Sequence, residues 1–233
     1  TALQAEDSVS RIDESVNKRN KGDFALWKLS KENEPSWPSP FGPGRPGWHI
    51  EDTAITEHFF GPQYDLHGGG SDLKFPHHEA EIAQQESVSG KNPFVKIWIH
   101  TGFLTLNGQK MSKSLGNFMT IDNFLKSFSP QVFRLLVLSA HYRSPLDYVQ
   151  KLGNENRAKW FSILEFLAKL KIIKSGPSAG SGVVRLTVFQ KNFEESLADD
   201  FNIPKALAAL FSLMGDLNPR IWKLARGEAK KGY

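Results

Sequence analysis

The stretch "YDLHGGGSDLKFPHHEAEIAQQES", residues 64–87, contains the pattern that decides the fold. Its first residues predict a strand that runs into a glycine turn, and residues 76–87 predict a helix with proline in its first turn. Consecutive glycines have no side chains to pack, so they suggest that a ligand approaches the main chain, although a simple tight turn would explain them equally well. The order of strand, glycine loop and helix predicts an α/β fold, which binds ligands beyond the carboxyl ends of its strands.

The segments on either side extend this alternation of strands and helices to about residue 145. Residues 23–30 predict a short strand, and residues 95–106 predict a longer, mostly apolar one, as in a sheet covered on both faces. Residues 32–48 contain five prolines and three glycines, so this loop must be irregular. Helices are predicted over residues 49–60, 120–128 and 129–142, the last with Ser129 as its N-cap.

Beyond Tyr142 only helical periodicity continues. Residues 146–173 carry apolar side chains at largely helical spacing, and a flexible joint rich in glycine and serine follows them. Two further helices are predicted over about 184–198 and 203–226, the second with Asn202 as its N-cap. The sequence therefore predicts an α/β part followed by a helix bundle.

Composition and charge limit the classes of protein that this chain can belong to. The 233 residues carry a formal net charge of +4 and a pI near 9.2, which permits contact with phosphates without singling out nucleic acid. The sequence has no cysteine, so it excludes disulfides, and any metal held by this chain would need His, Asp or Glu ligands. No apolar run is long enough for a bilayer and no secretory pattern is present, so we expect no membrane association and a cytoplasmic location.

The segment "PHHEAE" places two metal-binding residue types on one helix face. His77 and Glu81 are four residues apart, whereas His78 is rotated away from them. Such a pair can share a metal, but it is more commonly an ordinary hydrogen bond on a helix surface. A metal would need a further ligand from elsewhere in the chain, and the spacing does not show which side chain converges on the pair. The candidates are His67, Asp52 and Glu51.

The stretch "GFLTLNGQKMSKSLGNF", residues 102–118, begins as a strand and ends in a small, polar loop. Lys110 and Lys113 flank Ser112 in this loop, and a lysine ammonium is a mobile point charge that can follow phosphate charge as it develops. A solvated surface loop has the same composition. Composition alone therefore does not separate a phosphate-binding loop from an ordinary surface loop.

Several long segments, in order, resemble cysteinyl-tRNA synthetase, a class I aminoacyl-tRNA synthetase. "KMSKS" at 110–114 is similar to the second signature of the class, and the resemblance covers nearly the whole chain, most closely residues 22–148. Four further segments carry it: "WKLSKENEPSWPSPFGPG" (27–44), "GRPGWHIE" (44–51), "DLHGGGSDLKFPHHEAEIAQ" (65–84) and "SLADDFNIPKALAAL" (196–210). The resemblance implies that cysteine and ATP form cysteinyl adenylate, from which cysteine passes to tRNA(Cys).

The resemblance also implies a division of the chain. We expect residues 1–21 to end a connecting segment and to be partly disordered. Residues 22–145 would form the C-terminal half of a Rossmann-like catalytic domain, and residues 146–233 a helix bundle that contacts tRNA. The first class signature, of the HIGH type, does not occur in the sequence. The chain is therefore expected to be a fragment that does not aminoacylate by itself.

The resemblance assigns roles to residues of the loop and of the glycine stretch. Lys113, and with it Lys110, would act on ATP, which is bound with Mg²⁺. Trp48 and His67 would face the substrate cysteine. The remaining residues implied in ATP binding are Met111, Ser112, Ser114, Gly68, Gly69, Gly70 and Asp72.

His77 and Glu81 match two zinc ligands of the family, but the sequence departs from the family pattern at a third. The segment usually written "GWHIEC" is "GWHIED" here, so Asp52 stands where a cysteine ligand is expected. Aspartate can bind Zn²⁺, and a cysteine from outside the chain would complete a set of Asp52, His77 and Glu81. The alternative is that the chain binds no zinc.

The expected partners are tRNA(Cys), ATP and L-cysteine, and the expected state is a monomer. Basic side chains of the helix bundle would contact tRNA phosphates, although each could equally belong to a solvated helix face. A cysteine ligase of the mycothiol pathway and a noncatalytic tRNA-binding module are the alternatives; "DDFNIP" and "LHGGGSDL" favour the synthetase. The basic residues are Lys151, Arg157, Lys159, Lys223 and Arg226.

Overall fold

The structure is a computed structural model that describes residues 18–20, 22–111, 116–172 and 180–225. Contacts divide the chain into two compact units, residues 1–101 and 102–233. The predicted boundary near residue 145 has a different basis, the change from α/β to helical sequence, and it stays a prediction. The expected lead-in, residues 1–21, lies largely outside the described residues.

The first unit begins with a small antiparallel pair of strands formed by β1 (Trp27–Leu29) and β2 (Gly44–Pro46). The proline-rich loop between them has no regular structure apart from an isolated bridge, as its composition predicts. Only glycine fits at Gly47, because a Cβ there would lie 1.7 Å from the carbonyl oxygen of Ala25. This close approach holds the following segment against the start of β1.

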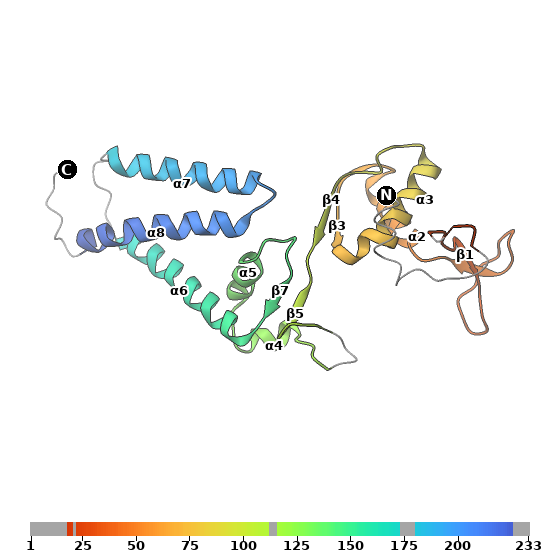
Figure 1. The fold of residues 1–233 in the computed structure, drawn as a ribbon, viewed down its shortest axis with the longest axis horizontal. Coiled ribbons are helices and arrows are strands. Elements are labelled where there is room, and N and C mark those ends of the chain that lie inside the picture. The colour runs from red at the N-terminus through yellow and green to blue at the C-terminus, as the bar shows by residue number, and fades with distance from the viewer. Residues whose placement is uncertain (1–17, 21, 112–115, 173–179, 226–233) are drawn as a thin grey trace. The chain divides into compact units, whose positions relative to one another are not determined.

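The centre of the first unit is a parallel pair of strands, β3 (Tyr64–Gly70) and β4 (Val95–Thr101). The chain crosses between them through a 3₁₀ turn (Ser71–Leu73), a π-helical segment (Lys74–His78) and α3 (Glu79–Ser89). Helix α2 (Ile50–Phe60) precedes β3 and contacts α3, as Figure 1 shows. The predicted order of strand, connection, helix and strand is confirmed.

The structure corrects two details of the strand predicted over residues 95–106. The strand ends at Thr101, and β5 (Leu104–Leu106) is a separate strand in the second unit. The break falls at Gly102, where a Cβ would lie 2.3 Å from the carbonyl oxygen of Ser144. The sheet is also not covered on both faces within the described residues, because the paired side chains of Leu66 and Ile97 are 51% and 55% exposed.

The second unit contains a three-stranded sheet in the order β6-β5-β7, formed by β5, β6 (Gln109–Lys110) and β7 (Leu146–Tyr148). Strands β5 and β6 form a hairpin whose turn, Asn107 and Gly108, has positive φ at both positions, as two-residue hairpins favour. Strand β7 pairs in parallel with β5. The helix predicted from residue 146 is therefore wrong for residues 146–148, which form a strand. Their long-range pairing with β5 outweighs their local pattern.

Two short helices, α4 (Ile121–Leu125) and α5 (Pro130–Leu138), pack against the sheet of the second unit. The N-cap predicted at Ser129 is confirmed, because its hydroxyl accepts a hydrogen bond from the backbone nitrogen of Val132 at 3.4 Å. A compact apolar core joins these helices to β7. Its buried members are Phe124, Phe128, Val132, Leu136 and Tyr148.

Three long helices follow: α6 (Gln150–Ile172), α7 (Gly180–Ala198) and α8 (Ile203–Ala225). Figure 1 shows α7 and α8 side by side, and α6 also contacts α8. The predicted N-cap is confirmed, because the Asn202 side chain accepts from the backbone nitrogen of Lys205 at 3.2 Å. The joint predicted before α7 lies mostly outside the described residues. None of the helices in the described ranges has the length and apolar character that crossing a membrane requires.

A polar cluster connects the loop before β7 to the turn between α7 and α8. The Asp200 carboxylate accepts from the Tyr142 hydroxyl at 2.6 Å and from Arg143 at 2.5 Å and 2.9 Å. These hydrogen bonds, with Arg143 first, lower the pKa of Asp200 to about 2. The cluster fixes a connection between segments 57 residues apart in the chain.

We predict that this cluster stabilises the protein above about pH 4 and loses its effect toward pH 2. The reason is that Asp200 has a lower pKa in the folded protein than in the unfolded chain, so protonation favours unfolding. Asp200→Asn should lower the melting temperature at neutral pH, and its difference from wild type should shrink as the pH falls through this range. Thermal unfolding followed by circular dichroism measures both, with the exposed neighbour Asp199→Asn as control. A difference that is independent of pH would contradict the prediction.

Candidate functional site

Three side chains from three different elements converge in the first unit. Asp52 lies in the first turn of α2, His77 in the π-helical segment and Glu81 in the first turn of α3. His77 Nε2 lies 2.9 Å from Asp52 Oδ2 and 3.0 Å from Glu81 Oε1. One ligand atom from each residue lies within 4.8 Å of the other two, so the three could hold one metal ion.

Local structure and packing between helices bring these residues together. His77 and Glu81 share a helix face through their spacing of four residues, and α2 contributes Asp52 because it packs on α3. The Nδ1 atoms of His77 and His49 are 2.6 Å apart, as in a hydrogen bond. This contact occupies Nδ1 of His77 and leaves Nε2 directed at the two carboxylates, which is the arrangement of a metal-binding histidine with an outer partner.

Glu81 is the electrostatic centre of the site. Its side chain is fully buried, and neither carboxylate oxygen has a well-formed hydrogen bond among the described residues, although His77 is close. Burial, and secondly the carboxylates of Asp52 and Glu51, raise the pKa of Glu81 to about 8. A buried carboxylate with these neighbours requires a proton or a cation to offset its charge.

A second group of side chains shares Glu81. One ligand atom each from His67, His78 and Glu81 also lies within 4.8 Å of the others. Nδ1 of His67 contacts the Tyr64 hydroxyl, and Nδ1 of His78 lies 2.8 Å from Nε2 of His100. Burial, followed by the neighbouring histidines, lowers the pKa of His78 to about 3, so this imidazole is neutral at physiological pH.

Trp48 and His67, both predicted to face a substrate, lie at this cluster. The Trp48 ring stacks on His49 and His77, with centroid distances of 4.8 Å and 5.4 Å, and it remains 57% exposed. Sequence reasoning missed His49 and His100 and placed His78 away from the site. The parallel register of β3 and β4 is the signal that would have indicated His100. His67 pairs with Trp98 and Gly69 pairs with His100, so His100 lies two residues further along β4, on the same face of the sheet as Trp98.

The structure corrects the turn predicted for the glycine stretch. Gly68, Gly69 and Gly70 are part of β3 and do not form a turn. A Cβ at Gly69 would lie 2.7 Å from Cε1 of His78, so this glycine makes room for the histidine ring. A Cβ at Gly70 would lie 2.5 Å from Oδ1 of Asp72. Their role in ATP binding stays a prediction.

We expect Gly69→Ala to destabilise the protein by about 1–3 kcal/mol, because the added methyl group overlaps a ring that is held by His100. Gly68→Ala is the matched control, since its Cβ would meet only the carbonyl oxygen of Ile99 at 3.6 Å, an ordinary contact. Denaturant unfolding of the two variants measures the difference. Equal stability of the two variants would show that His78 moves aside without cost.

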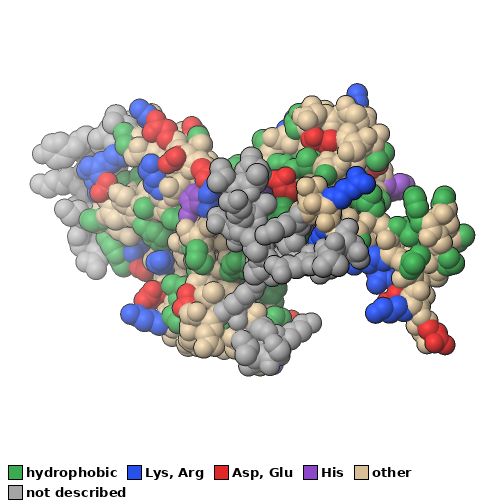
Figure 2. Space-filling model, turned by 45° about the vertical axis from the view of Figure 1, so that its right-hand side comes forward, with side chains coloured by type: hydrophobic (Ala, Val, Ile, Leu, Met, Phe, Trp, Pro, Cys, Tyr) green, Lys and Arg blue, Asp and Glu red, His purple; other side chains and the backbone are tan. Residues whose placement is uncertain are grey.

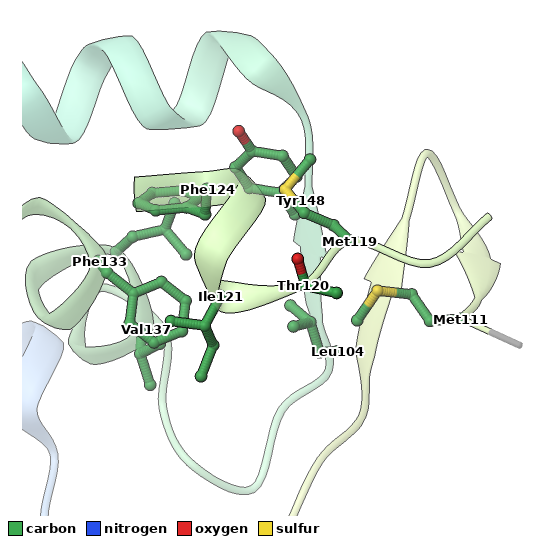
Figure 3. A pocket seen from close by; sticks show the side chains of 10 residues that line it. Leu104, Met111, Met119, Thr120, Ile121, Phe124, Phe133, Val137 and Tyr148 are labelled. Carbon is green, nitrogen blue, oxygen red and sulfur yellow. The ribbon is translucent and has the colours of Figure 1, made fainter. Parts of the chain in front are cut away.

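The lysine-rich loop lies in the second unit. Lys110 ends β6, whereas Ser112, Lys113 and Ser114 lie outside the described residues. Met111 and Met119, on either side of that gap, both line an apolar cavity of about 60 Å³ (Figure 3). The two ends of the loop are thus attached to one apolar core. Further lining residues are Leu104, Thr120, Ile121, Phe124, Phe133, Leu136, Val137 and Tyr148.

The basic residues predicted to contact phosphates lie partly on α6. Lys151 is 3.8 Å from Glu155, and the Arg157 guanidinium lies over the Phe128 ring at 5.5 Å. Figure 2 shows Lys and Arg side chains interspersed with acidic ones on the face in view. The side chain of Lys223, and Arg226 as a whole, are outside the described part of the chain. These residues therefore stay candidates for phosphate contacts.

Two family descriptions match this chain. Residues 2–157 match "tRNA synthetases class I (C) catalytic domain", and residues 192–230 match "DALR domain". The first match contains both the Asp52–His77–Glu81 site and the lysine-rich loop. The α/β part and the helical part observed in the structure therefore correspond to two described families.

Curated relatives are similar over most of this chain. A cysteine–tRNA ligase of Carboxydothermus hydrogenoformans is 46% identical over 214 residues, which cover 91% of this chain and 46% of the relative. A cysteine–tRNA ligase of Thermoplasma acidophilum is 45% identical over 223 residues, which cover 95% of this chain and 48% of the relative. The chain thus spans about half the length of the curated relatives it matches.

Solved structures share the fold at low sequence identity. A LeuRS of Agrobacterium radiobacter, in a ternary complex with tRNA and LeuAMS, matches 86% of this chain and 29% of its own with a TM-score of 0.63 and 14% identity. The methionyl-tRNA synthetase of Mycobacterium tuberculosis, bound by methionyl-adenylate, matches 72% of this chain and 36% of its own with a TM-score of 0.53 and 18% identity. These likenesses concern the fold alone.

Proposed function

The chain belongs to the family of class I (C) tRNA synthetases, and from this we propose that the protein carrying it is a cysteine–tRNA ligase. It activates L-cysteine with ATP and Mg²⁺ to cysteinyl adenylate and transfers the cysteine to tRNA(Cys). The observation that carries the proposal is the convergence of Asp52, His77 and Glu81 beside the exposed ring of Trp48. This donor set suits Zn²⁺, and zinc suits the thiol that distinguishes cysteine from other amino acids.

The three side chains fit Zn²⁺ in donor type and in charge. Carboxylate oxygens and imidazole nitrogens are zinc ligands. Burial, and secondly the neighbouring carboxylates, raise the pKa of Glu81; a divalent cation would offset both and would provide a partner for its buried oxygens. The sequence has no cysteine, so a protein thiolate ligand would have to come from outside these 233 residues. When bound, Zn²⁺ supplies a Lewis-acidic attachment point for the substrate thiolate.

The residues around this set would orient it and line the place of the cysteine side chain. His49 contacts Nδ1 of His77 and so keeps Nε2 of that ring toward the carboxylates. Tyr64 holds the His67 ring through its hydroxyl. In the proposed function, Trp48 and His67 line the side-chain pocket, and the Trp48 ring shields the ligands from water on one side.

The lysine-rich loop and the glycine stretch would bind ATP. Lys113, with Lys110, would neutralise the charge that develops on the triphosphate as pyrophosphate leaves, in concert with Mg²⁺. Apolar packing of Met111 supports this role, because it anchors the start of the loop. Other residues proposed to contact ATP are Ser112, Ser114, Gly68, Gly69, Gly70 and Asp72.

The helical part would bind tRNA(Cys). The match of residues 192–230 to the DALR domain and the exposed basic side chains of α6 support this assignment. We propose residues 22–145 as the catalytic part and residues 146–233 as the tRNA-contacting part of a cytoplasmic monomer. Light scattering of the full-length protein, with and without tRNA, tests the monomeric state and the binding.

The test of the proposed function is cysteine-dependent ATP–pyrophosphate exchange by the full-length protein, followed by transfer of radiolabelled cysteine. We expect exchange with cysteine but not with serine, and transfer to tRNA(Cys). Transfer to a glucosaminyl-inositol would instead identify a cysteine ligase of the mycothiol pathway. Binding of tRNA without exchange would identify a noncatalytic module. The isolated 233-residue polypeptide is expected to show no exchange, because it has no HIGH-type signature.

A further inference from the structure

A second cavity in the second unit is independent of every residue assigned above to cysteine or ATP. It has a volume of about 180 Å³ and lies between α5, α6 and α8. Most of its walls are apolar, and α8 contributes residues at the spacing of one helix face. The apolar lining residues are Leu135, Pro204, Leu207, Ala208 and Phe211, and the polar ones are Ser139, Asn156 and Lys159.

Asn156 is the unusual member of this lining. Its side chain is fully buried, and Nδ2 donates to the carbonyl oxygen of Leu152 at 2.9 Å. Its Oδ1 atom is buried and has no hydrogen-bond partner among the described residues. The Ser139 hydroxyl, also at the cavity, donates to the carbonyl oxygen of Leu136. A buried acceptor without a donor is costly and rare in folded proteins, so this atom of a cavity-lining residue indicates a missing partner.

Lys159 supplies a positive charge to the lining of the cavity. It follows Asn156 by three residues on α6, lines the cavity and is exposed. Its ammonium group makes no ion pair with another described residue. The lining of the cavity therefore combines a residue with a buried acceptor, apolar side chains and an exposed cation.

We propose that this cavity is a binding site for a small organic molecule of about one aromatic ring. An apolar body would contact the apolar lining, an O–H or N–H group would donate to Asn156 Oδ1, and an anionic group would pair with Lys159. The size is adequate, because an apolar cavity of about 150 Å³ takes up benzene.

Two probes of nearly equal size test the donor. Phenol carries an O–H group that toluene lacks, so phenol should bind the full-length protein about fivefold more tightly than toluene. In Asn156→Leu, which keeps a side chain of similar size, this preference should disappear while toluene still binds. Ligand-detected NMR titration measures both affinities without depending on catalysis.

Two further variants test whether the probes bind in this cavity and whether Lys159 contributes to binding. Ala208→Phe adds a ring at an exposed position of the lining, so it should abolish binding of both probes without a loss of melting temperature. 4-Hydroxybenzoate should bind more tightly than phenol by about twofold to fivefold, and Lys159→Gln should remove that gain. Lys151→Gln, an exposed lysine of α6 that does not line the cavity, is the matched control and should retain it.

The inference is overturned by any of three results. The first is that neither probe binds the wild-type protein at millimolar concentration. The second is that Asn156→Leu keeps the preference for phenol, or that Ala208→Phe leaves binding intact. The third is a crystal structure of the full-length protein in which ordered water alone, or a side chain from outside these 233 residues, fills the cavity. None of these results bears on the proposed ligase activity.

Discussion

Replacing Asp52 with alanine is expected to weaken zinc binding by the full-length protein at least about 100-fold, because even outer partners of metal ligands contribute 10-fold to 100-fold. Asp52 Oδ2 is 2.9 Å from Nε2 of His77, which places this carboxylate in direct reach of an ion held by His77 and Glu81. We expect cysteine-dependent exchange to fall with the bound zinc, and the preference for cysteine over serine to fall as well.

The neighbouring residue supplies the control for this experiment. Glu51 lies on the same first turn of α2, carries the same charge and is exposed, so Glu51→Ala should retain zinc. Elemental analysis gives the stoichiometry, and competition with a chelator gives the affinity. Equal zinc content and affinity in wild type and Asp52→Ala would show that Asp52 is not a ligand. A melting temperature close to that of wild type would separate ligand loss from unfolding.

Lys113→Ala should lower kcat for ATP–pyrophosphate exchange by about 100-fold to 1,000-fold, as removal of one group that stabilises transition-state charge does in other enzymes. The effect should fall mainly on kcat, with a small change in KM for ATP, because the proposed role of Lys113 develops as pyrophosphate leaves. Zinc content should stay unchanged, since the zinc site uses other residues.

A lysine elsewhere in the second unit provides the matched control for this substitution. The Lys126 side chain donates to Asn123 at 2.9 Å on the exposed surface, and it does not line the cavity of Met111. Lys126→Ala should therefore exchange at the wild-type rate. A rate for Lys113→Ala within a few-fold of the wild-type rate would remove this lysine from the proposed catalytic residues.

The helices and caps were predictable because they depend on local spacing. Ser129 and Asn202 accept the expected hydrogen bonds, and α2, α7 and α8 lie close to their predicted ranges. Residues 146–148 were not predictable in this way. They form β7 because β5 lies beside them, and no local pattern of residues gives the position of a strand some 40 residues earlier.

The glycine stretch shows that a sequence can indicate a close approach to the main chain without indicating which group approaches. Three glycines do suggest a close approach to the main chain. In the structure the approaching group at Gly69 is the His78 ring, a side chain from the connection that follows the strand. The predicted rotation of His78 away from His77 also turned it toward His67 and His100, which a helix pattern alone could not show.

The sequence by itself determined the order of strand, connection, helix and strand in residues 64–101 and the family resemblance. It also determined the pairing of His77 with Glu81, because helical spacing fixes neighbours within one turn. Residue spacing left the third member of that site open; the family resemblance implied Asp52, and only the tertiary structure shows which side chain reaches His77. Among Glu51, Asp52 and His67, packing of α2 on α3 brings Asp52 to His77, while His67 lies 3.8 Å from Glu81 in the second group. The physical reason is that contacts between separate elements depend on long-range packing, which residue spacing along the chain does not encode.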